Sequence, residues 1–502
     1  MSEPAVAVID IGKTNKKIHV YNKALEMIDS RSQTFGTFVR DGVSFESTAE
    51  LHEWLLDTLS ALASRHKIEV IAISAHGACF ACVDEAGDLS VPVVDYTFEP
   101  GESFHEEFYR VAGDKHELQR STATLELKAL VNPGKGIFFL KERFPEEFAR
   151  TKHILMYAQY FAFKLTGEIT SDPTYLACHT YLFDHHTLGY SEAADRLGIR
   201  ELLPERLQNP GDVAGRILPE VAARTGLSPL TRVLVGIHDS NASLIPYLIK
   251  KHDEDFIVNS TGTWCVTMHP EKSIRFSEDE IGKAVFYNMS AFRDPVKTTI
   301  LVGGLEFETY TKLLRESFGL GEFPPFDPRI YRDVVKEKAE FILPTVVHGT
   351  GQYPGSVARV VDHGESFPLQ EIASGKRAPA VFANAARAYA VLNLSLALQT
   401  STALRRVGLR DGSVVYTEGG FRNNQDYNRI LATLHPSCFF RLSGMPEATS
   451  FGAALLGWSA LEDVPVTSMT DRFELTEEAV AAVELPGIQE YAAAFYEQLE
   501  EA

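Results

Sequence analysis

The chain has 502 residues, too many for one compact core, so we expect two or three domains. Its hydrophobic content of 45% and charged content of 23% are those of an ordinary soluble globular protein. The net charge of -20 excludes a general nucleic-acid or anionic-membrane surface as a partner. It does not exclude a phosphorylated ligand, because a pocket can be locally positive.

The cysteines and the N-terminus predict a cytoplasmic protein. Five cysteines are too few for a secreted disulfide framework. Cys79 and Cys82 form one C-x-x-C pair, and without a second pair we expect half-buried thiols near a pocket rather than structural zinc. We identify no signal or transit peptide and no apolar run of bilayer length.

The first element contains a P-loop-like triplet, in "AVAVIDIGKTNKKIHVYN". The P-loop pattern needs a glycine where Ala7 stands and a helix after the triplet. Residues 17–21 instead alternate as a half-buried strand does. The unit is therefore a strand, a tight turn and a second strand, whose backbone N–H groups can cradle an anion. An ordinary hairpin carrying an aspartate is the alternative.

The rest of the first half mixes strands and helices. We expect a third strand over residues 26–35, a helix over 48–65 and a buried strand over 69–77. Helical patterns dominate residues 101–166, and a Pro/Gly-rich loop follows near 203–227. A strand then reaches His238-Asp239-Ser240 and continues as a helix through Leu248.

The second half repeats the opening feature. "DFIVN" predicts a strand, Ser260-Thr261-Gly262-Thr263 a turn, and "WCVTM" a second strand. This repeat suggests duplicated domains that face one another, with chance similarity of two hairpins as the alternative. A long helix is predicted over 378–407. The strand that follows closes on Gly419-Gly420, and a helix is predicted over 423–433, an arrangement that suits close approach of a nucleotide.

In this order, the elements from about residue 5 to 460 resemble the FGGY carbohydrate kinases, members of the actin, hexokinase and heat-shock chaperone ATPase superfamily. The resemblance rests on "DIGKTNKK", "ISAHGACFACVD", "DPTYLACHTYLFDHHTLGYS", "GIHDSNAS", "STGTW", "YTEGGFRNNQDYNRILA" and "EATSFGAALLG". It implies an α/β fold of two ribonuclease-H-like (actin-like) domains with an ATP cleft between them. We place the N-terminal domain at 1–241, the C-terminal domain at 242–470 and a helical tail at 471–502. The string around His238 and the Trp after Gly-Thr look most like the rhamnulokinase and fuculokinase branch.

The resemblance also implies roles for individual residues. Asp239 is expected to act as the catalytic base, although capping the following helix is the ordinary role for such an Asp. Asp10 is expected to hold Mg²⁺ through water, with a turn-stabilising role as the alternative. The predicted phosphate ligands are Gly12, Lys13, Thr14, Asn15, Lys17, Thr261, Gly262 and Thr263. The predicted adenosine ligands are Gly419, Gly420 and Asn423, and the predicted sugar ligands are His76, Gly77, Tyr96, His238 and Asp239.

A few positions depart from the family pattern or have a second interpretation. Lys13 has no family counterpart and is expected either to add charge at the turn or to be solvated. Lys16 is expected to be exposed, as most lysines are. "CHTYLFDHH" looks metal-binding in composition, but its place in the family favours His179 near the sugar and residues 184–186 in a connecting hairpin.

The predicted function is an ATP-dependent kinase for a primary hydroxyl of a ketose, with ATP and Mg²⁺ as cofactors. L-Fuculose or L-rhamnulose is the first guess for the sugar, and a ketopentose (xylulose or ribulose) or a tetritol is the alternative. A non-catalytic sugar or nucleotide sensor is the alternative from another class, and a chaperone-like or polymer-forming ATPase is a third. The sugar and ATP are the expected partners, with no nucleic acid or membrane, and a homodimer is one option for assembly.

Overall fold

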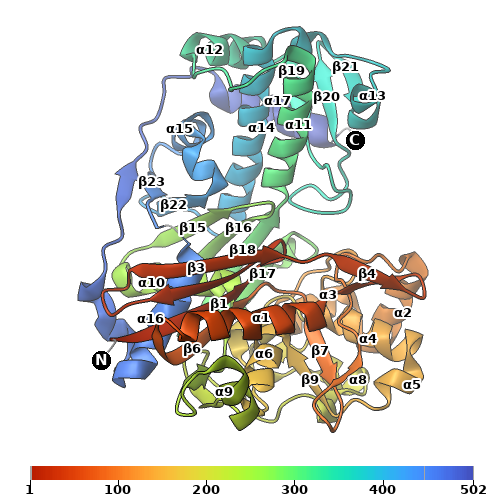
Figure 1. Cartoon of the computed structure of the whole chain (residues 1–502). Coiled ribbons are helices and arrows are strands. Elements are labelled where there is room, and N and C mark those ends of the chain that lie inside the picture. The colour runs from red at the N-terminus through yellow and green to blue at the C-terminus, as the bar shows by residue number, and fades with distance from the viewer. Residues whose placement is uncertain (1–2, 446, 501–502) are drawn as a thin grey trace.

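The computed structural model describes residues 3–445 and 447–500 and consists of two α/β halves (Figure 1). Each half is built on a mixed sheet, and the predicted fold class is confirmed. The first sheet has the order β12-β13-β6-β1-β2-β3, with β14 also pairing with β6. Its strands are β1 (Pro4–Ile11), β2 (Asn15–Tyr21), β3 (Met27–Thr34), β6 (Lys67–Ala75), β12 (Val213–Arg216), β13 (Arg232–Leu234) and β14 (Ile237–His238).

The second sheet has the order β17-β18-β16-β15-β22-β23-β24. Its strands are β15 (Phe256–Thr261), β16 (Cys265–Pro270), β17 (Val285–Met289), β18 (Pro295–Leu301), β22 (Val414–Gly419), β23 (Phe439–Ser443) and β24 (Glu477–Ala479). In both sheets an antiparallel hairpin (β1–β2, β15–β16) lies beside a parallel strand (β6, β22). The duplication suggested by the repeated hairpin is therefore present in the topology.

Two helices occupy the layer between the sheets: α10 (Asp239–Lys250) and α16 (Ala448–Glu462). Successive residues of a strand face opposite sides of a sheet, so Val6 and Val8 of β1 pack in one cluster with α16. In α10, Ile245 packs in that same cluster, whereas Tyr247 packs with strands of the second sheet. Both halves are thus anchored to α10, and Asp239 is its first residue.

The outer faces of the sheets carry the remaining long helices. α1 and α6 pack on the first sheet, and α14 packs with α11, α12 and α15 in the core of the second half. The helices of the first half are α1 (Thr48–Ala63), α2 (Glu102–Ala112), α3 (Lys115–Thr122), α4 (Pro133–Arg143), α5 (Pro145–Phe148), α6 (Tyr157–Thr166), α7 (Pro173–Leu176), α8 (Glu192–Arg196) and α9 (Pro219–Thr225). Those of the second half are α11 (Gly303–Phe318), α12 (Pro328–Glu337), α13 (Leu369–Ala373), α14 (Ala385–Arg406), α15 (Gln425–Leu434) and α17 (Ile488–Glu500).

The small sheets correct two expectations. β9 (His153–Met156) interrupts the stretch predicted to be helical, because it pairs with β7 (Phe80–Val83), which also pairs with β8 (Leu89–Val91). Cys79 and Cys82 are fully buried in this core, not half-buried. The other short strands are β4 (Thr37–Arg40), β5 (Val43–Glu46), β10 (Phe183–Asp184), β11 (Gly189–Tyr190), β19 (Glu340–Leu343), β20 (Arg359–Asp362) and β21 (Glu365–Pro368).

The domain limits at 241/242 and 470/471 stay predictions. The first limit falls inside α10, and the predicted tail contains β24, which pairs with β23, and α17, which packs on α12 and β19. Among the described residues, we find no helix long and apolar enough to cross a membrane.

Candidate active site

The first predicted phosphate turn connects β1 to β2. The Gly12 N–H donates to the Asn15 carbonyl at 3.0 Å. A Cβ on Gly12 would lie 2.9 Å from that carbonyl oxygen, so the tight turn requires glycine. Thr14 and Asn15 are exposed at the tip of this turn, where a ligand can reach them.

Lys13 points away from this turn. Its Nζ lies 2.5 Å from Glu46 Oε1 and 2.7 Å from Asp95 Oδ1, and it sits 4.5 Å from the centre of the Tyr96 ring. Burial raises the pKa of Asp95, but hydrogen bonds from Lys13 and Thr97 outweigh this and hold it below its usual range. The ammonium group is therefore held beside Glu46, Asp95 and Tyr96.

The other two lysines of the hairpin are also paired. Lys16 is only 2% exposed, which contradicts the expected solvation, and its Nζ donates to the Lys13 carbonyl at 2.6 Å. Burial lowers the pKa of Lys16. Lys17 Nζ lies 2.6 Å from Glu447 Oε2, just before α16, so this ion pair connects β2 to the C-terminal part of the chain.

Two glycines from other parts of the chain pack closely against the second predicted phosphate turn. A Cβ on Gly304 would be 1.9 Å from the Gly262 carbonyl oxygen, and one on Gly419 would be 2.0 Å from the Thr261 carbonyl oxygen. The Thr261 hydroxyl already donates to the Glu418 carbonyl and accepts from the Phe421 N–H at 2.9 Å. In this structure the Thr261 hydroxyl is therefore hydrogen-bonded within the protein, and its role as a phosphate ligand stays a prediction.

Gly304 belongs to a feature that the sequence analysis missed. Gly303 and Gly304 lie just after β18 and open α11, much as Gly419 ends β22 and Gly420 opens the short 3-10 helix η4 (Gly420–Asn423). The Leu305 N–H donates to the Thr263 carbonyl at 3.3 Å, so the start of α11 lies against the turn. The strand–glycine–helix pattern around Gly419-Gly420 also occurs at Gly303-Gly304, so the sequence did contain a signal for this feature. The predicted adenosine ligands Gly419, Gly420 and Asn423 are exposed beside it.

Asp10 is the penultimate residue of β1 and is 8% exposed. Burial, and secondly the charge of Asp239, raise the pKa of Asp10 to about 7. The Ser450 hydroxyl donates to Asp10 Oδ2 at 3.1 Å. A buried carboxylate beside a second carboxylate fits a divalent cation, whose charge would offset both.

Asp239 is the first residue of α10, and His238 occupies the N-cap position. Asp239 Oδ1 accepts from the Ser240 N–H at 2.6 Å and from the Ser240 hydroxyl at 3.2 Å. Its side chain is 30% exposed. Asp239 therefore does not take the ordinary N-cap role, and its carboxylate reaches open space.

That space is a cavity of about 200 Å³, which we call the cleft cavity. It brings together all of the predicted sugar ligands, His76, Gly77, Tyr96, His238 and Asp239, and adds Lys13. Most of the remaining lining of the cleft cavity is apolar, comes from both halves of the chain and was not predicted from the sequence. This apolar wall includes Leu127, Val131, Trp264, Val266, Phe286 and Ile300.

The histidines of the cleft cavity are neutral. Burial lowers the pKa of His76 to about 3, and its Nδ1 pairs with the Gly77 carbonyl at 2.8 Å. A ring nitrogen that faces a carbonyl carries the proton, so His76 Nε2 is left as an acceptor. His76 can therefore accept a hydrogen bond from a ligand through Nε2 but has no N–H left to donate. Burial also lowers the pKa of His238.

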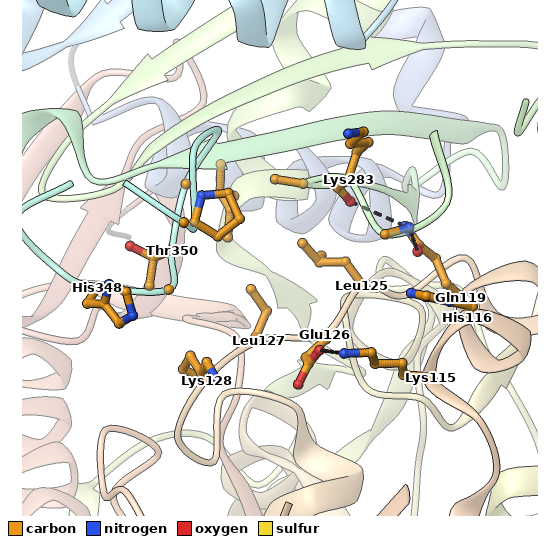
Figure 2. Close-up of a pocket in the computed structure, with 17 residues that line it drawn as sticks. Lys115, His116, Gln119, Leu125, Glu126, Leu127, Lys128, Lys283, His348 and Thr350 are labelled. Carbon is orange, nitrogen blue, oxygen red and sulfur yellow. Dashed lines mark hydrogen bonds and ion pairs between the residues drawn. The ribbon is translucent and has the colours of Figure 1, made fainter. Parts of the chain in front are cut away.

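A second cavity, of about 370 Å³, adjoins the first and shares Leu127 and Ile300 with it. Figure 2 shows this seam cavity, with Lys115, Lys128 and α3 on one side and Lys283 and the loop around His348 on the other. Lys115 pairs with Glu126 at 3.0 Å. The two halves of the chain thus border a hollow beside the cleft cavity, and they also touch directly there: the Gln119 amide donates to the Val285 carbonyl at 3.1 Å.

Comparisons with known proteins agree with this arrangement. The family model for the FGGY family of carbohydrate kinases, N-terminal domain, matches residues 5–246, and the model for carbohydrate kinase FGGY, C-terminal domain, matches 253–465. L-fuculokinase of Escherichia coli strain K12 is 25% identical over 288 residues, which are 53% of this chain and 57% of that protein. The match thus spans little more than half the length of this curated relative.

Solved structures match over the whole chain. A carbohydrate kinase from Novosphingobium aromaticivorans is 26% identical with a TM-score of 0.80, and the match covers 100% of both chains. Xylulose kinase from Lactobacillus acidophilus is 15% identical with a TM-score of 0.77, covering 99% of this chain and 96% of that chain. The second likeness is one of fold alone.

Proposed function

The chain belongs to the FGGY family of carbohydrate kinases, and from this premise we propose that it transfers the γ-phosphate of ATP to a primary hydroxyl of a ketose. The observation that carries the proposal is the position of Asp239. Its carboxylate lines the cleft cavity at the start of the helix that lies between the two sheets. A group placed there can reach a sugar held by one half and a phosphate held by both.

In the proposed reaction Asp239 orients the attacking hydroxyl and accepts its proton late, because the transition state of phosphoryl transfer is loose. The turns at 12–15 and 261–263 supply backbone N–H groups to the phosphates, with Lys17 nearby. Asp10 would hold Mg²⁺, which supplies neutralisation of phosphate charge when bound. Gly419, Gly420 and Asn423 would contact the adenosine.

We assign Lys13 to the sugar and not to the phosphates. Glu46 and Asp95 take up part of its hydrogen-bonding capacity, and the residue lines the cleft cavity. An ammonium group has three donors, so one is left for a sugar hydroxyl. With His76 and His238, Lys13 would form the polar side of the sugar site.

The apolar wall supports a 6-deoxy-ketohexose, L-fuculose or L-rhamnulose, as the sugar. A methyl group at C6 would lie against side chains such as Val131 and Phe286, and a hydroxyl that touched only these apolar side chains would lack a partner. Such a loss costs about 1–3 kcal/mol in proteins. A ketopentose (xylulose or ribulose) or a tetritol is the second choice, because each would leave part of this wall uncovered.

The test is an ADP-release assay over a panel of 6-deoxy-ketohexoses, their 6-hydroxy analogues, ketopentoses and tetritols. We expect the 6-deoxy sugars to have the highest kcat/KM, about 5- to 100-fold above the other sugars. Asp239→Asn should lower kcat by about 10²–10⁴-fold while sugar binding persists. If no sugar stimulates ADP release, the chain is a sensor; if Asp239→Asn matches the wild type, Asp239 is not the base.

A further inference from the structure

Three metal-ligating side chains meet at one end of the cleft cavity. Cys178 and His179 follow α7, and His238 ends β14. One ligand atom of each lies within 4.8 Å of the others. Cys178 Sγ and His238 Nε2 are 3.5 Å apart.

The backbone around Cys178, His179 and His238 allows the three side chains to approach one another. A Cβ on Gly77 would lie 2.8 Å from His238 Nε2 and 3.0 Å from His179 Nε2, so only glycine lets both rings approach. His179 has a φ of 47°, a left-handed conformation that costs free energy in a residue with a side chain. Among the residues that the structure describes, the buried His179 Nδ1 has no hydrogen-bond partner.

The donor set selects the kind of ion. A thiolate and two neutral imidazoles suit Zn²⁺, whereas Mg²⁺ prefers oxygen ligands. Bonds of about 2.0–2.3 Å place tetrahedral Zn²⁺ ligands about 3.3–3.8 Å apart. The Cys178–His238 pair already has this spacing, and His179 needs to move by only about 1 Å.

We propose that the cleft cavity contains a site for a thiophilic divalent cation of the Zn²⁺ type, formed by Cys178, His179 and His238, and that this ion and the sugar exclude one another. Binding replaces the thiol proton of Cys178, which passes to solvent. Asp239 Oδ1 lies 3.4 Å from His238 Nε2, so the ion would occupy the space beside the predicted base. Metal binding stands independently of the reaction, while exclusion of the sugar rests on the proposed function.

Co²⁺ is the probe for the site, because a cysteine thiolate bound to it gives a charge-transfer band in the near ultraviolet. Chelator-treated full-length protein should show this band with one equivalent of Co²⁺, and Zn²⁺ should abolish it. Cys178→Ser should lose the band, and Cys438→Ser, a free cysteine outside the site, should keep it. Absence of the band in the wild type, or its persistence in Cys178→Ser, overturns the site.

His179→Asn is the second variant, and circular dichroism checks that both variants fold. His179→Asn should weaken Co²⁺ binding at least tenfold and keep the thiolate band at high Co²⁺, whereas unchanged affinity removes His179 from the site. A sugar from the panel that the kinase phosphorylates should raise the apparent Kd for Co²⁺ without ATP present; an unchanged Kd refutes the exclusion. If no sugar is phosphorylated, the proposed function fails while the Co²⁺ titration still decides the metal site.

Discussion

Lys13 shows how a single side chain can take part in a different site from its backbone. Its backbone forms part of the first predicted phosphate turn, and its ammonium group bonds to Glu46 and Asp95 at the wall of the cleft cavity. The sequence placed Lys13 in the turn correctly but could not reveal its partners, since these lie 33 and 82 residues away. In contrast, the motifs that contain His76 and Asp239 were enough to predict that these two residues lie close together, and both line the cleft cavity.

The first prediction concerns Lys13→Met. Loss of one hydrogen bond from a charged donor costs about 1.5–3 kcal/mol, so the KM for the sugar should rise about tenfold or more. The KM for ATP should change little. Steady-state kinetics with each substrate varied in turn measures both values. Lys17→Met on the same hairpin is the matched variant and should raise the KM for ATP. If Lys13→Met also raises the KM for ATP, Lys13 contacts the phosphates and not the sugar.

The second prediction follows from the pKa of Asp10, which is raised from 3.8 to about 7. The folded protein therefore holds this proton to higher pH than the unfolded chain does, and the free energy of unfolding falls as the pH rises from about 4 to 7. Asp10→Asn removes the ionisable group and with it this pH-dependent loss of stability. The variant should gain more stability at pH 8 than at pH 5, by about 2–3 kcal/mol, while losing kinase activity.

Thermal unfolding at the two pH values measures this difference as a shift of a few degrees in Tm. The exposed Asp471→Asn is the control and should show the same Tm change at both values. A Tm gain for Asp10→Asn that is equal at pH 5 and pH 8 would show that Asp10 titrates normally.

At the scale of elements, the two hairpins and their parallel neighbours could be predicted, because each carries a local glycine or small-polar turn between apolar strands. The contact between the start of α11 and the second turn could not, since Gly304 lies 42 residues from Gly262 in the chain and the β16–β18 pairing brings the two together. β9 was missed for the same reason: a four-residue strand is defined by its partner β7, not by its own pattern.

The third prediction tests the contact between α11 and the second phosphate turn. The added methyl of Gly304→Ala would meet the Gly262 carbonyl oxygen at 1.9 Å, so the turn must move. We expect nucleotide affinity to fall at least tenfold, measured by calorimetry, together with a lower Tm. Gly321→Ala, where no atom lies within 4 Å of the new Cβ, is the control and should bind as the wild type does. If Gly304→Ala binds nucleotide normally, the second turn does not bind the phosphates.

At the scale of the whole molecule, the two halves share α10 and α16 (Figure 1). The cleft cavity and the seam cavity, the latter drawn in Figure 2, are lined by residues of both halves. The family resemblance predicted two domains around a cleft. The seam cavity was not predictable, because Lys115 and Lys283 come from segments with no motif and meet only in the folded chain.

The fourth prediction is closure of the two halves when both substrates bind. Closure would bring the sugar and the γ-phosphate together and exclude water, which limits futile ATP hydrolysis. Small-angle scattering should show a smaller radius of gyration with sugar plus a non-hydrolysable ATP analogue than with either alone. Identical curves for all states would mean that the cleft is already closed.

The packing of α16 against the first sheet determines when the N-terminal half can finish folding during synthesis. Gly457 lies so close to Val6 that a Cβ would approach its Cγ1 to 2.4 Å, although the two residues are 451 positions apart. One face of the first sheet therefore lacks this cover until nearly the entire chain has left the ribosome. The N-terminal half cannot finish folding during its own synthesis, and a nascent chain exposes apolar surface there for most of translation.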